Sequence, residues 1–415
     1  MLPLAEVRAL VLERCPALEP EPVEARYARG HVLAADIVVS ADVPAFASSG
    51  MDGFAVRTVD VATAATDIPV VLDVVDSVNA GRASTRTVGP RQAIRIMTGA
   101  PVPDGADAIV PVEMTRHSGG ERGSGETVAI LRPSAQGQHV RPAGDDVVAG
   151  TTVIEAGTHI DVALLGVLVA VGCHMVSVVP RPRVGVISTG DELVAAPRGL
   201  DAGQIRDSNR PMLLGAVSAA GARAIDLGWV GDDVDALAAA LRAAATRCDL
   251  VLTSGGVSMG EADVVKLVLD RMTDPHWLQV AIRPAKPFAL ATVAGVPLLG
   301  LPGNPVSALV SFELLARPAI RHMAGHSTLD RVVVTALAGP DLTRRPDGKV
   351  HYVRVTFERD ADGALVAVPI RAQGSHQLVA TAAAVGLAVV PDGDGAPEGT
   401  PVEVIVLDTA AALRA

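Results

Sequence analysis

The middle of the chain, residues 180–326, alternates short β-branched segments with longer segments of helical spacing. The expected strands are 184–188, 223–230, 250–253, 288–293 and 297–300, and the expected helices are 210–220, 234–245, 262–272 and 306–323. Strands separated by helices of this length are typical of βαβ units, which build a sheet of mainly parallel strands covered by helices. The sequence therefore predicts a three-layer α/β domain in this region.

The segments on either side of this region have a different pattern. Residues 3–15 predict an amphipathic helix, because apolar residues recur there at helical spacing and Pro3 suits a first turn. Residues 27–140 consist of short β-branched runs separated by glycine, proline and aspartate, which predicts a small β-rich module. Short, evenly spaced strands return from residue 331 onward and predict a small barrel or sandwich.

The longest apolar run, residues 162–173, is shorter than the roughly 18 residues that a membrane-spanning helix needs. We expect it to form a buried helix. The first residues include Glu6 and Arg8 and lack the basic start and apolar stretch of a signal peptide. No membrane is therefore expected among the partners.

Charge and cysteine content restrict the classes of partner further. The chain has 35 Lys and Arg residues against 46 Asp and Glu residues, a formal net charge of −11. This excess of acid argues against binding to nucleic acid or to an anionic membrane surface. Cys15, Cys173 and Cys248 lie far apart and are odd in number, so neither a disulfide framework nor a zinc site is indicated. We expect a reducing, cytoplasmic location.

Four glycine-containing loops follow the predicted strands, and three of them are also acidic: 189–192 (TGDE), 231–233 (GDD), 254–263 (SGGVSMGEAD) and 301–305 (LPGNP). Ligands of open α/β sheets bind outside the carboxyl ends of the strands. Glycines let backbone N–H groups approach a phosphate, and carboxylates can hold Mg²⁺ together with substrate phosphates. The plainer alternative is that the acids are ordinary helix N-caps. Four such loops on one rim favour a metal-assisted phosphate or pyrophosphate site.

Two cations lie in a stretch that is stiffened by proline. Arg283 and Lys286 belong to the segment 282–287 (IRPAKP), in which the two prolines restrict the backbone. A single arginine or lysine is usually solvated surface, but two cations on a defined loop can supply the anion-binding part of a site. We therefore count Arg283 and Lys286 among the candidate substrate-binding residues.

A second class of function is indicated by the pattern G-x-S-x-G at residues 256–260, which follows a predicted strand and precedes a predicted helix. In serine hydrolases this pattern carries the nucleophile on a tight turn directly after the strand. Here Ser254, Gly255 and Gly256 intervene between the strand and Ser258, and no histidine has an assigned carboxylate partner. A serine hydrolase that uses Ser258 remains the remote alternative.

The β-rich module has its own group of polar residues. Asp52, Thr98, Gly99 and Glu113 lie among predicted tight turns, in the segments 48–56 and 94–113. From the residue types alone, ordinary hairpin turns are the favoured interpretation.

Seven motifs, in chain order, resemble the molybdopterin molybdenumtransferase family, which includes the E domain of gephyrin. They are SGMDGFAV, IRIMTGAPVPDGADAIVPVE, VGVISTGDEL, GQIRDSNRPML, LTSGGVSMGEADVVK, PAKPFA and GLPGNPVSALVSFE. The resemblance covers essentially the whole chain, and several of the motifs are long. It implies insertion of molybdate into adenylylated molybdopterin, with Mg²⁺-dependent loss of AMP, as the final step of molybdenum cofactor synthesis.

The resemblance also implies four domains and a homodimer with an active cleft shared between subunits. We expect a discontinuous N-terminal domain (1–26 with 141–176), an inserted β-rich module (27–140), an α/β molybdopterin-binding domain (177–326) and a C-terminal β-barrel (327–415). The substrates implied are adenylylated molybdopterin and molybdate. The molybdopterin adenylyltransferase and molybdoenzyme chaperones are further expected partners.

Motif positions imply the site residues. Asp52, Thr98, Glu192, Asp232 and Asp263 match catalytic positions, and the last three are also the implied Mg²⁺ ligands. For Asp52 and Thr98, the resemblance replaces the turn interpretation with a role facing the partner subunit's cleft. The implied substrate-binding residues are Ser254, Gly255, Gly256, Ser258, Arg283, Lys286, Pro302, Gly303, Asn304, Pro305, Arg354 and Ser375, with Arg354 and Ser375 as molybdate contacts.

The sequence departs from the family pattern at two places. Ala285 stands where the family has glycine in P-G-K-P, and Gln279 stands where a lysine is common. The lost lysine weakens the expected anion site but leaves Arg283 and Lys286. A non-catalytic scaffold that binds molybdopterin is the alternative function, and the complete set of acids favours catalysis over it.

Overall fold

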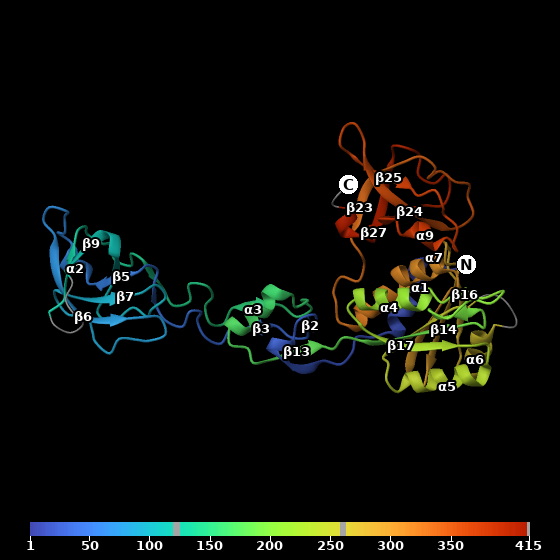
Figure 1. The fold of residues 1–415 in the computed structure, drawn as a ribbon, viewed down its shortest axis with the longest axis horizontal. Helices are drawn as coiled ribbons and strands as arrows, with labels where there is room; N and C mark the ends of the chain where they lie inside the picture. Colours follow the sequence, from blue (N-terminus) through green and yellow to red (C-terminus); the bar gives the residue numbers. More distant parts are fainter. Residues whose placement is uncertain (119–124, 258–262, 413–415) are drawn as a thin grey trace. The chain divides into compact units, whose positions relative to one another are not determined.

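The computed structural model describes residues 1–118, 125–257 and 263–412 (Figure 1). The chain forms two compact units. The larger unit contains Met1–Ala35, Gly157–Asp161 and Val176–Ala415, and the smaller contains Asp36–Ala156 and Val162–Met175. This division keeps the α/β region and the C-terminal strands together, while the boundaries of the four expected domains stay predictions.

The larger unit is built on a six-stranded sheet whose order is β17-β14-β18-β22-β21-β19. The first four strands are parallel, and β21 is antiparallel to both of its neighbours, β22 and β19. The predicted α/β fold with a mainly parallel sheet is therefore confirmed. The strands are β14 (Arg183–Thr189), β17 (Arg223–Val230), β18 (Leu250–Ser254), β19 (His276–Gln279), β21 (Pro287–Val293) and β22 (Val296–Leu301).

Helices cover both faces of this sheet, as Figure 1 shows for α5 and α6 on one side and α1, α4 and α7 on the other. The first core joins the sheet to α1 (Leu4–Arg14), α4 (Asn209–Ala219), α7 (Pro305–Ser311) and α8 (Arg317–Met323). The second core joins the opposite face to α5 (Val234–Ala245) and α6 (Val264–Met272). The central domain thus has the three layers that the sequence predicts.

The predicted helix 306–323 contains one irregular turn. Its path runs through α7, the π-helical turn η3 (Phe312–Ala316) and α8. The turn contains Glu313, whose side chain is only 3 % exposed and lies 2.6 Å from the Nε of Arg331. Arg331 also donates to the second carboxylate oxygen at 2.9 Å and to the carbonyl of Leu407 at 3.1 Å. This buried ion pair connects the helix to the C-terminal strands.

The C-terminal region is a small closed barrel. Its strands follow the order β24-β25-β23-β27-β26, and an additional pairing of β24 with β26 closes the ring. Of the two predicted possibilities, barrel and sandwich, the barrel is confirmed. The strand β20 (Ile282–Arg283) joins β24 in parallel. The barrel strands are β23 (Val333–Ala338), β24 (Val350–Arg359), β25 (Leu365–Pro369), β26 (Gly386–Val390) and β27 (Pro401–Val406), with the short helices α9 (Leu378–Thr381) and α10 (Thr409–Ala412).

Two small sheets complete the larger unit. β13 (Met175–Val179) lies between β1 (Glu21–Glu24) and β2 (Val32–Leu33). β15 (Leu193–Val194) pairs in parallel with β16 (Ile205–Arg206). The second pair lies directly after β14, so it borders the carboxyl edge of the large sheet.

The smaller unit is β-rich, as predicted. Its six-stranded sheet has the order β8-β5-β7-β6-β10-β9, and two short ladders pair β11 with β4 and β12 with β3. Its core is built almost entirely from valine, isoleucine, leucine and alanine. The elements are β3 (Ile37–Val38), β4 (Ser48–Ser49), β5 (Gly53–Val56), α2 (Thr58–Val61), β6 (Val70–Val78), β7 (Gln92–Ile96), β8 (Ala108–Pro111), β9 (Thr115–Ser118), β10 (Thr127–Ile130), β11 (Val140–Arg141) and β12 (Thr152–Ile154).

The apolar helix predicted at 162–173 is present as α3 (Val162–Ala170), but the prediction that it is buried was wrong. Within the chain only Leu168 is buried, and the side chains of Val162 and Val169 are 70 % and 58 % exposed. The helix is apolar on all sides, so packing of one face leaves the other apolar residues in solvent. In the described part of the chain, no helix combines the length and the apolar character needed to cross a bilayer.

We expect Arg331→Ala to lower the free energy of unfolding by about 3 kcal/mol, because it leaves the buried Glu313 carboxylate without its closest cation. Urea unfolding followed by the fluorescence of Trp229 and Trp277, both in the larger unit, measures this loss. The control is Asp330→Ala, which breaks the exposed pair of Asp330 with Arg8 and should cost less than about 1 kcal/mol. Equal losses in the two variants would contradict the assigned role of the buried pair.

Candidate active site

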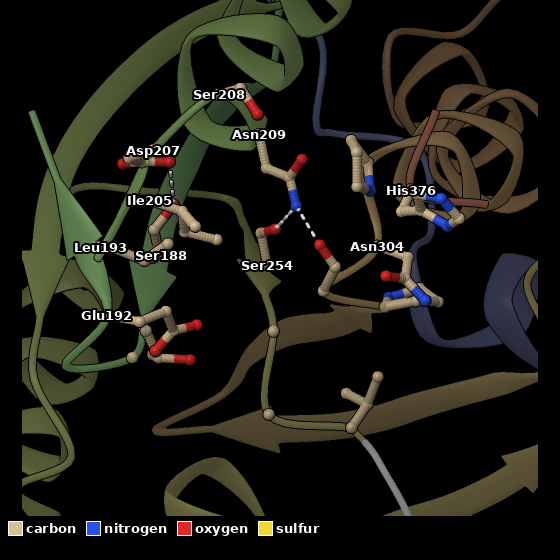
Figure 2. Close-up of a pocket in the computed structure, with 18 of the residues that line it drawn as sticks. Ser188, Glu192, Leu193, Ile205, Asp207, Ser208, Asn209, Ser254, Asn304 and His376 are labelled. Carbon is tan, nitrogen blue, oxygen red and sulfur yellow. Dashed lines mark hydrogen bonds between the residues drawn. The ribbon is translucent and has the colours of Figure 1, made fainter. Parts of the chain in front are cut away.

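A pocket of about 760 Å³ lies at the carboxyl ends of the parallel strands (Figure 2). The loops after β14, β17, β18 and β22 all contribute to its lining, and the barrel contributes His376 and Leu378. The predicted site residues that line it are Glu192, Asp232, Ser254, Gly255, Gly256, Asp263, Pro302, Gly303, Asn304 and Pro305. The structure therefore brings together ten residues that are spread over more than 110 positions of the sequence.

The strand order explains why the pocket forms here. β14 has β17 on one side and β18 on the other. The chain leaves β14 through α4 on one face of the sheet and returns from β17 to β18 through α5 on the opposite face. Loops that leave adjacent strands toward opposite faces open a crevice between them, which is where ligands of open α/β sheets bind.

Glycine is required at the end of β18. Gly255 and Gly256 have φ values of +96° and +73°, a region that residues with a Cβ rarely adopt. A Cβ on Gly256 would also lie 2.1 Å from Cγ2 of Val265 in α6. Gly256 therefore lets the backbone of the loop approach α6, and Gly255 lets it pass close to Thr189 at the end of β14.

Asn209, at the start of α4, links two loops of the pocket. Its Nδ2 donates to Oγ of Ser254 at 2.8 Å and to the carbonyl of Gly303 at 2.7 Å (Figure 2). One amide thus fixes the distance between the loop after β18 and the loop after β22. Asn209 was not among the predicted site residues, although it lies inside the motif GQIRDSNRPML.

A second set of bonds fixes the start of α4. Oγ of Ser188 donates to Asp207 at 3.0 Å, and Nε of Arg210 donates to the same carboxylate at 2.8 Å. Arg210 also pairs with Asp226 of β17. Asp207 lines the pocket, but its carboxylate is occupied by these bonds to the side chains of Ser188 and Arg210.

The acids of the rim divide into two groups. Asp233 and Asp263 accept hydrogen bonds from backbone N–H groups of α5 and α6. For these two residues the alternative interpretation as ordinary helix N-caps therefore applies. Asp191 accepts from the backbone N–H of Asp232 at 3.0 Å. The carboxylates of Glu192 and Asp232 are exposed and make no hydrogen bond or ion pair within the described residues.

The expected metal ligands Glu192, Asp232 and Asp263 do not form a ready-made site. Among the described residues, no group of three or more Asp, Glu, His or Cys side chains is arranged to hold a metal ion. One reason is that Oδ1 of Asp263 is turned to the N–H of Val265 at 3.1 Å. The three acids line one pocket without converging on one point, and their role as Mg²⁺ ligands stays a prediction.

The barrel loop at residues 372–378 lies at the pocket. The carbonyl of Ser375 accepts the backbone N–H of Val306 in α7 at 3.0 Å. Arg354 is buried, and its two Nη atoms donate to the carbonyls of Ala372, Gly374 and Gln377 and to Oγ1 of Thr381 at 2.7–3.1 Å. A direct contact of Arg354 with molybdate, as the resemblance implies, requires the guanidinium to exchange these acceptors.

Arg283 and Lys286 are exposed and do not line the pocket, whereas their neighbour Pro287 does. Ala285, between them, has a φ of +77°. The residue that replaces the family's glycine therefore keeps the left-handed conformation that glycine favours, at a cost of about 1 kcal/mol. Ser258 lies outside the described residues.

Asp52 and Thr98 lie in the smaller unit, where they bond to each other. One carboxylate oxygen of Asp52 accepts the backbone N–H and the Oγ1–H of Thr98, each at 2.7 Å. These two bonds hold the pKa of Asp52 below its ordinary value. The resemblance implied a functional role for both residues, and the structure shows that they are in direct contact.

Comparison with protein families matches nearly the whole chain in three segments. Residues 2–172 match the MoeA N-terminal region (domain I and II), residues 185–322 match a probable molybdopterin binding domain, and residues 340–407 match the MoeA C-terminal region (domain IV). The serine hydrolase alternative finds no counterpart in these matches.

Individual relatives agree with the family matches. The chain is 41 % identical over 398 residues to molybdopterin molybdenumtransferase 2 of Mycobacterium tuberculosis, covering 94 % of this chain and 96 % of the relative. It is 33 % identical to molybdopterin molybdenumtransferase of Bacillus subtilis, covering 90 % and 87 %. The crystal structure of a molybdopterin biosynthesis MoeA protein from Pyrococcus horikoshii superimposes with a TM-score of 0.83 at 30 % identity, covering 98 % and 99 %.

We expect Thr98→Val to raise the pKa of Asp52, because the variant loses the Oγ1–H donor and keeps the backbone N–H. A carboxyl whose pKa is lowered by folding stabilises the protein above its unfolded pKa, and that contribution is lost as the pH falls through the folded value. In the variant the folded and unfolded pKa values of Asp52 lie closer together, so the stability lost on acidification should be smaller and the loss should end at a higher pH. Carboxyl NMR titration measures the shift directly. Thr115→Val, which removes a hydroxyl bonded to the carbonyl of Val112, is the control and should leave Asp52 unchanged.

Proposed function

The chain belongs to the molybdopterin molybdenumtransferase family, and we propose that it inserts molybdate into adenylylated molybdopterin with release of AMP. The observation that carries the proposal is the pocket that joins four glycine-containing loops of the sheet to one loop of the barrel. Its volume, about 760 Å³, falls within the usual range of roughly 300–1,000 Å³ for small-molecule sites. The backbone N–H groups of its glycine loops suit the phosphates of such a substrate.

The charge of the pocket supports a requirement for Mg²⁺. Four carboxylates and one arginine, Arg206, are found among the described lining residues, so a substrate that carries a pyrophosphate meets an excess of negative charge. Mg²⁺ is usually bound by one or two carboxylates together with substrate phosphates. We infer that Glu192 and Asp232 hold the ion and that Asp263 takes part beside them. When bound, Mg²⁺ neutralises the pyrophosphate and so favours the departure of AMP.

The residues of this chain position the substrate. Asn209 holds the loop of Ser254 against the loop of Gly303, so both loops can contact one molecule without rearranging. Pro302 and Pro305 stiffen the second loop. Arg283 and Lys286, exposed beside Pro287, supply positive charge toward the phosphates as charge shifts to the leaving AMP. These groups orient the adenylate and stabilise the charge that develops on it.

The cysteines of the chain support the view that the sulfur ligands of molybdenum come from the substrate. Burial raises the pKa of Cys15 to about 12 and also raises the pKa values of Cys173 and Cys248. Thiolate is the form that binds metals, and none of the three residues lines the pocket. The dithiolene of molybdopterin is therefore the proposed sulfur donor.

We propose that the chain acts as a homodimer in which Asp52 and Thr98 serve the pocket of the partner subunit. The exposed valines of α3 support an interface between copies, because an apolar helix in solvent is unfavourable. The exposed, charged Asp52 carboxylate supports a function beyond its own turn. We further propose that the molybdopterin adenylyltransferase and molybdoenzyme chaperones are partners of the chain. The proposed location is the cytoplasm.

The proposal predicts that purified protein, adenylylated molybdopterin, molybdate and Mg²⁺ release AMP, which chromatography measures. Removal of Mg²⁺ with EDTA should abolish release, and added Mg²⁺ should restore it. Asp263→Asn should reduce the rate by at least about a hundredfold, because it removes a negative charge from the reacting region. Asp249→Asn, which alters an acid outside this pocket, is the control and should keep the wild-type rate. Wild-type release equal to that of Asp263→Asn would instead support a non-catalytic, molybdopterin-binding scaffold.

The shared cleft predicts complementation between two inactive variants. Asp52→Ala and Asp263→Asn place their defects in different parts of the chain, so a mixed dimer has one intact site of two. Random assortment makes half of the dimers mixed, and about a quarter of the wild-type activity should return after subunit exchange. The control is either variant exchanged with itself. A mixture that stays inactive while mass spectrometry detects mixed dimers would show that each site is built from one subunit.

A further inference from the structure

The barrel contributes one titratable side chain to the pocket, His376, and the proposed function does not yet use it. His376 lines the pocket and is exposed. Its ring makes no hydrogen bond or ion pair among the described residues, although Figure 2 shows it on the pocket wall beside Asn304. The side-chain amide of Asn304 likewise has no partner in the described part of the chain.

The backbone that carries His376 is held firmly. The carbonyl of Gly374 accepts Nη2 of Arg354 at 3.1 Å, and the carbonyl of Gln377 accepts Nη1 at 2.9 Å. The carbonyl of Ser375 accepts the N–H of Val306, and Oε1 of Gln377 accepts the N–H of Gly374 at 2.6 Å. A free ring on a fixed backbone is preorganised for binding, because little backbone freedom is left to lose when a ligand arrives.

The two walls of the pocket differ in charge. Glu192 and Asp207 lie on the wall opposite His376 and Asn304, with Asn209 and Ser254 between them (Figure 2). The Asp207 carboxylate is paired with Arg210, but the exposed Glu192 carboxylate repels an oxyanion, whereas the second wall presents an imidazole N–H and an amide N–H. The acidic wall therefore suits a cation, and the wall on the barrel side suits an oxyanion of the same bound substrate.

We propose that His376 is a substrate-contact residue that donates a hydrogen bond to an oxyanion at the barrel side of the pocket. This inference rests on the proposed function, which supplies two oxyanions of the same chemistry, molybdate and the pyrophosphate of the adenylate. The barrel then takes a direct part in substrate binding.

Steady-state AMP release tests the inference with the complete protein, varying molybdate and adenylylated molybdopterin separately. His376→Ala should raise the KM for one of the two by about tenfold to a hundredfold, since hydrogen bonds to charged groups contribute about 1.5–3 kcal/mol and each 1.4 kcal/mol is tenfold. The substrate whose KM rises identifies the oxyanion. The kcat should change less than about threefold, because a binding contact is lost. His376→Gln, which keeps an N–H donor, should recover part of the affinity.

Val379→Ala is the matched control, because Val379 lies in the same part of the barrel, is 92 % exposed and does not line the pocket. It should leave both KM values unchanged. The inference is overturned if His376→Ala keeps both KM values within twofold of wild type. If the wild-type protein releases no AMP, the proposed function fails separately, and calorimetric titration of wild type and His376→Ala with molybdate and with AMP decides the inference. Equal affinities for both probes would then reject it.

Discussion

The parallel pairing of β14 with β17 and β18 is the constraint on which the site depends. Parallel strands place all their carboxyl ends at one edge, so the loops after them must meet there whatever their separation in sequence. The change of face at β14 then opens the crevice between those loops. The glycines, the acids and the Asn209 amide act only within this arrangement, because none of them brings the loops together from a distance.

Most of the fold can be predicted from local patterns. The five expected strands of the α/β domain lie within one residue of their predicted ranges, since buried strands are continuous β-branched runs. The edge strand β19 was not predicted. Local sequence patterns gave wrong or incomplete predictions where tertiary contacts determine the structure. The apolar composition of α3 suggested burial, but burial needs a neighbouring surface that the sequence does not reveal. The π-helical turn at Phe312–Ala316 was also missed, because helical spacing does not distinguish a regular turn from one widened around Glu313.

The sequence predicted which residues form the candidate site better than it predicted how they are arranged. Ten lining residues were predicted from glycine-rich and acidic loops, because the position of these loops directly after predicted strands indicates that they lie at one edge of the sheet. The sequence did not reveal their separate roles: Asp263 caps a helix, while the carboxylates of Glu192 and Asp232 have no partner in the part of the chain that the structure describes. Asn209 and His376 were missed as pocket residues because their significance arises from neighbours that are about 45 to 94 and 70 positions away along the chain, respectively. Single-sequence patterns contain no signal for such long-range contacts.

The barrel loop meets α7 through a bond between two backbone groups, the N–H of Val306 and the carbonyl of Ser375. A backbone bond does not depend on which side chains stand at the two positions, provided that the first is not proline. The barrel can therefore diverge widely in sequence while this loop stays in register with the pocket. Substitution of single side chains in the loop can therefore change substrate preference without altering the backbone contact between the barrel and α7.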